Sequence, residues 1–163
     1  MEFNKHPLKS SISVESALPK IKHYCAYQER SHYEVKEKLY KLGLYKTGVE
    51  TLLAQLIEED YLNEERFARR FASGKFSLKK WGRIKIKHEL KLKRVSEYNI
   101  KIGLKEIREE DYTLTLQKLT DDKWDNLKGE KSITRQAKTM AFLLQKGYEA
   151  PFVQQAIKNI AGK

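Results

Sequence analysis

The chain has 163 residues, 40% of them hydrophobic and 34% charged, so it can bury the core of one domain or of a few small units beneath a highly charged surface. No apolar run approaches the roughly 18 residues that span a bilayer, and the polar start of the chain lacks the apolar segment of a signal peptide. Cys25 is the sole cysteine, which excludes an intramolecular disulfide, and we expect a cytoplasmic protein.

The net charge of +11 is concentrated in one part of the chain. Residues 74–108 hold 12 Lys and Arg against 3 Asp and Glu, a net charge of +9. A charge that serves only solubility would be spread along the chain, whereas a focused charge favours a polyanionic partner. A solvated helical face is the alternative explanation for the same residues.

The chain begins with a polar, Ser-rich segment, residues 1–16, which we predict to be a disordered tail. From Ala17 onward the pattern is typical of short helices separated by brief breaks. Ser31 and Glu34 have the spacing of a capping box at a helix start, and Gly43 suits the left-handed position after a helix end. The helices are predicted near residues 19–29, 31–42, 46–58, 63–76, 82–94, 96–108, 110–126, 131–146 and 150–161.

One of these segments has a competing strand pattern. Residues 84–92 alternate between apolar and polar side chains, as a half-buried strand does. We predict a helix, because Ile86 and Leu90 are four residues apart and match Val35 and Leu39 in an earlier segment rich in helix formers.

The chain contains an internal repeat with periods of 51 and 53 residues, anchored at Leu39, Leu90 and Leu143. Apolar residues recur 5, 10, 14 and 17 positions after each anchor, and the last three spacings fall on one helical face. These residues are Leu44, Val95 and Tyr148, then Val49, Ile100 and Val153, then Leu53, Leu104 and Ile157, then Leu56, Ile107 and Ile160. Such self-similarity predicts an all-α, elongated, curved array of three three-helix units, at residues 17–58, 59–108 and 109–163.

The sequence carries no recognisable catalytic, metal or nucleotide motif. The four histidines have no HExxH spacing, and neither a P-loop nor a GxGxxG is present. We therefore expect no enzyme activity, no metal and no cofactor.

The candidate binding residues are cations of the central unit. Four of them, Arg83, Lys87, Lys91 and Arg94, fall along one helical stripe suited to phosphates, and we expect Arg83 and Lys87 to be exposed. Trp81 lies among cations and either stacks on a base or, as we prefer, covers a helix junction. The full set of candidates is Arg69, Arg70, Lys75, Lys79, Lys80, Arg83, Lys85, Lys87, Lys91, Lys93 and Arg94.

A longer motif spans the central unit. It runs Tyr61-Leu62-Asn63-Glu64-Glu65-Arg66-Phe67-Ala68, followed after a basic stretch by Gly82, Ile86, Glu89-Leu90 and Val95. This pattern resembles the RecX family, bacterial regulators of the RecA recombinase, and residues 17–43 share parts of it. Where the family has a glycine before the last position, this chain has Arg94, and arginine is costly at positive φ.

The resemblance implies tandem three-helix repeats of helix-turn-helix-like shape and a monomer that binds the RecA–single-stranded-DNA filament. Family members limit filament extension or promote disassembly, and so inhibit recombination, ATP hydrolysis and the co-protease activity of the SOS response. The candidate cations would then contact RecA or DNA, with duplex DNA as a further ligand. The alternatives are a generic helical nucleic-acid-binding module without a recombinase partner, and a structural adaptor whose charge serves only solubility.

Overall fold

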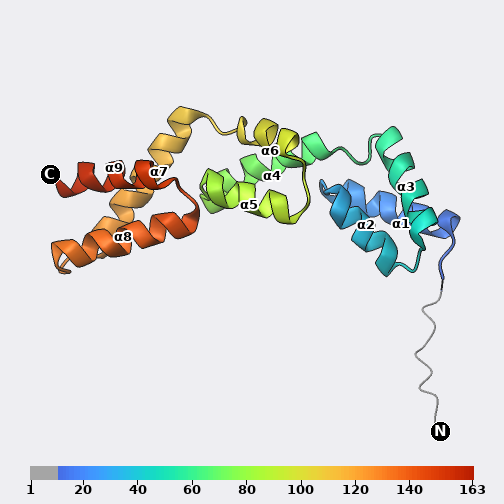
Figure 1. The fold of residues 1–163 in the computed structure, drawn as a ribbon, viewed down its shortest axis with the longest axis horizontal. Coiled ribbons are helices and arrows are strands. Elements are labelled where there is room, and N and C mark those ends of the chain that lie inside the picture. Colours follow the sequence, from blue (N-terminus) through green and yellow to red (C-terminus); the bar gives the residue numbers. More distant parts are fainter. Residues whose placement is uncertain (1–10) are drawn as a thin grey trace, which may run out of the picture. The chain divides into compact units, whose positions relative to one another are not determined.

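The computed structural model describes residues 11–163, and over these residues the fold is entirely α-helical, as predicted (Figure 1). The helices are α1 (Val14–Tyr27), α2 (His32–Lys41), α3 (Lys46–Glu58), α4 (Glu64–Lys79), α5 (Arg83–Leu92), α6 (Glu97–Leu104), α7 (Glu109–Asn126), α8 (Ser132–Lys146) and α9 (Ala150–Ala161). The predicted segments and the observed helices correspond one to one along residues 11–163.

The start of α1 differs most from its prediction. The helix begins at Val14, because the Ser13 hydroxyl accepts a hydrogen bond from the backbone N–H of Ser16 at 3.1 Å and caps the helix there. Pro19 therefore lies inside α1 and not at its start. Residues 14–16, assigned to a tail from the sequence, are helical, and the first ten residues of that tail lie outside the described part of the chain.

The segment with the strand-like alternation is the helix α5. Ile86 and Leu90 are fully buried, whereas Ile84 and Leu92 are 53% and 59% exposed. Only the apolar residues that are four apart enter the core, so the helical period and not the alternation describes the packing.

The repeat register marks the core of the described helices. The anchors Leu39, Leu90 and Leu143 are fully buried, and the residues 5 and 10 positions later in each repeat are buried as well. The positions at 14 and 17 are buried or half-buried. The internal repeat in the sequence therefore corresponds to the same pattern of buried positions in three successive groups of helices.

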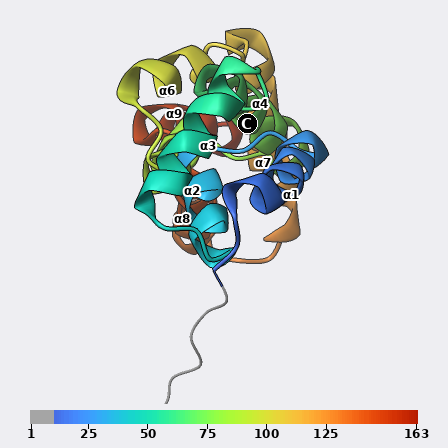
Figure 2. The same cartoon turned by 90° about the vertical axis from the view of Figure 1, so that its right-hand side faces the viewer.

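The chain divides into two compact units, one up to Phe67 and one from Ala68, with the boundary inside α4. In the first unit α1, α2 and α3 pack around a continuous apolar core (Figures 1 and 2). The α2 start is capped within its own sequence: Ser31 Oγ accepts from the Glu34 N–H at 3.1 Å, and Glu34 Oε2 accepts from the Ser31 N–H at 2.8 Å. This is the predicted capping box.

In the second unit the start of α5 is capped by a distant turn. The Gly82 N–H donates to the Lys146 carbonyl at 2.8 Å, and the Ile84 N–H donates to the Gly147 carbonyl at 3.0 Å. The Tyr148 hydroxyl adds a bond to the Lys80 carbonyl at 2.9 Å. The turn between α8 and α9 thus supplies acceptors for backbone donors that α5 leaves unpaired within itself.

This contact depends on two glycines. A Cβ added at Gly82 would lie 2.3 Å from the Gly147 carbonyl carbon and oxygen. A Cβ at Gly147, whose φ is 99°, would lie 2.3 Å from the Lys85 Cβ. Gly82 is needed for the close approach, and Gly147 is needed both for the approach and for its left-handed backbone.

Candidate nucleic-acid interface

The indole of Trp81 lies close to two lysines of the second unit. Lys75 Nζ is 5.0 Å from the indole ring centroid, and Lys85 Nζ is 4.5 Å from it. The chain reaches this position because Lys80, with φ 57°, ends α4 in the left-handed conformation, and the Trp81 N–H then donates back to the Lys75 carbonyl at 3.2 Å. Both ammonium groups are within the range of a cation–π interaction.

The same arrangement continues along α4 and to the end of α5. Lys75 Nζ also lies 5.4 Å from the Phe71 ring centroid, and Lys93 Nζ lies 5.9 Å from it. We call Phe71, Lys75, Trp81, Lys85 and Lys93 the lysine–aromatic ladder. All five side chains are half-buried, so the rings hold three positive charges at the surface of one unit.

Two lysines of the ladder have charges that no carboxylate of the described residues neutralises. Neither Lys75 nor Lys85 forms an ion pair within residues 11–163; their contacts there are with aromatic rings. A cation held on a ring keeps its charge available to an anion, because the ring contributes no negative formal charge. The ladder therefore offers an anion both positive charge and an aromatic face.

Further cations lie on the surface around the ladder. Lys79, Lys80 and Lys87 are exposed, as is Arg70 on α4. The Lys80 ammonium donates to the Ser77 carbonyl at 2.7 Å, which keeps its charge close to the end of α4. Together with the three ladder lysines, these four exposed cations make seven predicted candidates that combine charge with accessibility or with an aromatic support.

Two other candidates have ion-pair partners within the second unit, and a third has an unusual backbone conformation. Arg69 forms an ion pair with Glu106, and Lys91 Nζ lies 3.5 Å from Glu97 Oε1. Arg94 adopts a φ of 57°, the left-handed conformation that glycine adopts at little cost. The helix α5 therefore ends sharply although an arginine follows it.

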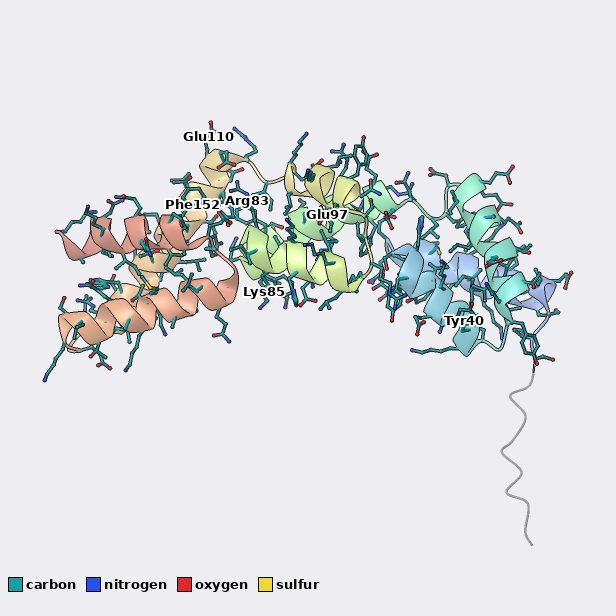
Figure 3. The ribbon with its side chains drawn as sticks, in the orientation of Figure 1. Tyr40, Arg83, Lys85, Glu97, Glu110 and Phe152 are labelled. Carbon is teal, nitrogen blue, oxygen red and sulfur yellow. The ribbon has the colours of Figure 1, made fainter. Side chains whose placement is uncertain are left out.

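The expectation that Arg83 is exposed is wrong. Its side chain is 20% exposed, with Nη2 at 2.5 Å from Glu109 Oε1 and Nη1 at 3.6 Å from Glu149 Oε2. The guanidinium carbon also lies 3.9 Å from the Tyr112 ring centroid. Figure 3 shows Arg83 and Lys85 leaving α5 on different sides. The predicted phosphate stripe therefore loses its first member, which holds α5 to the helices that follow.

Sequence reasoning missed the polar network that surrounds Arg83. The Tyr112 hydroxyl donates to Glu149 Oε1 at 2.6 Å and accepts from the Arg83 N–H at 3.1 Å. Burial raises the pKa of Tyr112, and the hydrogen bond to Glu149 adds to this shift. Tyr112 also stacks on Tyr148, with ring centroids 5.1 Å apart. The one available signal was Tyr148, an aromatic residue at a core position of the repeat.

The first unit contains the sole cysteine, which is buried. Burial raises the pKa of the Cys25 thiol to about 11, so the reactive thiolate is disfavoured.

Within residues 11–163, His, Cys, Asp and Glu side chains form no group of three or more with the arrangement of a metal site. Over the same residues, none of the helices has the length and apolar character to cross a bilayer.

Comparisons with known proteins agree with the motif in the central helices. The sequence model of the second three-helix domain of RecX matches residues 63–104. The regulatory protein RecX of Halalkalibacterium halodurans is 31% identical over 139 residues, which cover 85% of this chain and 52% of that protein. The regulatory protein RecX of Pelodictyon phaeoclathratiforme is 30% identical over 131 residues, which cover 79% of this chain and 80% of that protein.

Similarity in structure extends over most of the chain. The crystal structure of RecX from Lactobacillus salivarius has a TM-score of 0.82 at 19% identity, covering 92% of this chain and 97% of that one. Several curated relatives are longer, and this chain spans 52%, 39% and 62% of three of them, about half their length. The all-α fold, the motif and these matches place the chain in a family of proteins named for regulation: it belongs to the RecX family.

Proposed function

We propose that this protein is a non-enzymatic regulator that binds the RecA–single-stranded-DNA filament and inhibits recombination, ATP hydrolysis and co-protease activity. It would do so by limiting filament extension or by promoting disassembly. Its membership of the RecX family, whose curated members are named regulatory proteins, supports the regulatory class. The observation that supports a contact with DNA is the lysine–aromatic ladder. It lies in the part of the chain that holds most of the net positive charge.

The chemistry of the ladder suits a single strand. Lysine ammonium groups neutralise backbone phosphates without reading bases, and an aromatic ring offers a stacking surface to any base. Lys75 Nζ and Lys85 Nζ lie 5.0 Å and 4.5 Å from the Trp81 ring centroid, so phosphates bound by these lysines would lie next to an aromatic ring. Binding of this kind weakens by roughly 0.7 log units per log unit of salt for each single-strand phosphate neutralised.

The structure divides the predicted contact residues by availability. We assign the contact with DNA or RecA first to the ladder lysines and to exposed Lys79, Lys80 and Lys87, with Arg70 beside them. Arg69, Arg83 and Lys91 have carboxylate partners inside the unit and would have to give up an ion pair to bind phosphate. We therefore assign these three residues to stabilising the fold rather than to contact with DNA or RecA.

The test is RecA's DNA-dependent ATP hydrolysis on single-stranded DNA, with this protein added below RecA stoichiometry. The informative variant is Lys75→Gln with Lys85→Gln, which keeps the aliphatic stems on the rings and removes two charges. The matched control is Lys118→Gln with Lys158→Gln, two exposed lysines of the same unit on α7 and α9. We expect strong inhibition by the native protein and by the control, and a marked loss with the ladder variant.

Other outcomes would identify the alternatives. Inhibition only at the concentration that coats the DNA, with the same steep salt dependence, would favour a generic nucleic-acid-binding module. No inhibition of the cognate recombinase would contradict the proposal and leave a structural adaptor. Equal inhibition by the ladder variant and its control would move the contact surface away from the ladder.

A further inference from the structure

A second group of cations and tyrosines lies in the first unit, outside the residues of the ladder. Four residues of α1 stand at positions i, i+3, i+4 and i+7 and so form one stripe along the helix: Lys20, His23, Tyr24 and Tyr27. Lys38 of α2 and Arg30 of the connection between α1 and α2 complete the group. Together with Leu42, these residues line an open groove of about 360 Å³, within the size range of ligand pockets.

The ring of Tyr24 organises the cations of this groove. The Arg30 guanidinium carbon lies 3.8 Å from the ring centroid, and Lys38 Nζ lies 5.5 Å from it. Arg30 is fixed further, because its Nε donates to the Tyr24 carbonyl at 3.2 Å. These contacts place two positive charges at defined positions on an aromatic face.

The groove concentrates charge that the composition of this region conceals. Residues 1–58 have a net charge of only +2, yet the groove is lined by Lys20, Arg30, Lys38 and His23 and by no carboxylate. Glu34 and Glu37 line a separate hollow that shares Tyr24 and Lys38, and Glu34 is engaged there by the Ser31 N–H at 2.8 Å.

Tyr27 is the residue of the groove that the fold does not explain. Its ring is 77% exposed at the end of the α1 stripe, and it is not part of the core of the first unit. Proteins that bind single-stranded nucleic acids use this arrangement: an exposed aromatic ring stacks on a base, and neighbouring cations bind the phosphates.

We propose that this α1–α2 groove is a second binding site for single-stranded nucleic acid. A base stacks on Tyr27, and the flanking phosphates lie against Lys20, Arg30 and Lys38. Stacking on a ring and charge contacts with phosphate do not select a base, so the site accepts any sequence. The site goes beyond the proposed regulation of RecA and requires no recombinase.

The first experiment locates the contact without a partner protein. The full chain is irradiated with an oligothymidine that contains 5-iododeoxyuridine, and the cross-linked peptide is identified by mass spectrometry. We expect a cross-link at Tyr27, which persists when Lys75→Gln and Lys85→Gln weaken the ladder. Cross-links confined to residues from Ala68 onward would overturn the proposal.

The second experiment measures affinity by fluorescence anisotropy in the same Lys75→Gln, Lys85→Gln background. Tyr27→Ala should weaken binding of oligothymidine roughly fivefold or more, the usual loss when one stacked base loses its ring. Tyr45→Ala is the matched control, because Tyr45 is also 77% exposed in the first unit but lies outside the groove. Equal affinities of the two variants would overturn the proposal.

A charge-matched pair completes the test. Lys20→Glu should weaken binding and lower the salt dependence, whereas Lys36→Glu, at an exposed position of α2 outside the groove, should change both much less. Equal effects would mean that net charge and not the groove determines binding, which would also overturn the proposal. Because none of these assays contains RecA, a failure of the recombinase proposal leaves their results unaffected.

Discussion

Replacing Gly82 by alanine tests the junction between α5 and the α8–α9 turn with a single methyl group. The Gly82 backbone has a φ of −77° and a ψ of 166°, a conformation that alanine adopts freely. Any loss of stability must therefore come from the contact and not from the backbone. The new Cβ would lie 2.3 Å from the Gly147 carbonyl oxygen and 2.4 Å from the Tyr148 nitrogen.

The expected loss of stability depends on how far the α8–α9 turn must shift to admit the new methyl group. Ordinary Cβ contacts begin near 3.4 Å, so the turn must shift by about 1 Å, enough to break the 2.8 Å and 3.0 Å bonds that cap α5. Each lost backbone bond costs about 0.5–1.5 kcal/mol, and more where a buried group stays unpaired. Alanine returns about 0.4–1 kcal/mol by restricting the unfolded chain. We expect a net loss of about 1–2 kcal/mol.

Tryptophan fluorescence during urea unfolding measures this loss in the correct part of the chain. The protein has two tryptophans, Trp81 and Trp124, and both belong to the unit that begins at Ala68. Gly74→Ala is the matched control, since Gly74 lies inside α4 with no atom within 4 Å of its added Cβ. The control should gain about 0.5–1 kcal/mol. A Gly82→Ala midpoint equal to or above the native one would refute the packing argument.

Three further changes test local features of the helices. Arg94→Gly should raise stability by about 0.5–1 kcal/mol in the same fluorescence assay, because glycine removes the strain of a φ of 57°; a loss would show that the Arg94 side chain outweighs its backbone. Asn63→Ala should cost about 1 kcal/mol in a thermal melt, since Asn63 Oδ1 accepts from the Arg66 N–H at 2.9 Å, and Asn63→Asp should retain the cap. Burial lowers the pKa of His32 from its ordinary 6.5, so the stability it contributes is present above about pH 6.5 and is lost as the pH falls through the lowered pKa. Thermal melts from about pH 7.5 to about pH 5 should therefore show a decline that His32→Gln reduces, and an unchanged slope would contradict this assignment.

Local sequence signals predicted the helices well. The spacing of Ile86 and Leu90 outweighed the alternation around them, because only residues on one helical face can share a core. Ser31 caps α2 as predicted, since a cap requires only a side chain and a backbone N–H three residues away. Gly43 also has the positive φ, 102°, that its place after a helix suggested.

Signals that depend on distant residues were not available from the sequence. Arg83 looked like one more surface cation, because its carboxylate partners Glu109 and Glu149 come 26 and 66 residues later. The groove around Tyr24 and Tyr27 was equally hidden, since the net charge of a segment does not show which side chains the fold brings together. The ladder was predicted in part: its lysines were candidates, but their common support on Phe71 and Trp81 required the turn at the end of α4.

The long-range cap of α5 has a consequence for how the chain is made and how it can be shortened. A ribosome synthesises Gly82 and Ile84 more than 60 residues before the Lys146 and Gly147 carbonyls that accept their hydrogen bonds. Contacts of such separation form slowly, and here they cannot form until the third group of helices has left the exit tunnel. A fragment that contains only residues 63–104, which match the model of the second RecX domain, would begin α5 with unpaired N–H groups. The repeat borders visible in the sequence are therefore poor places to truncate this protein.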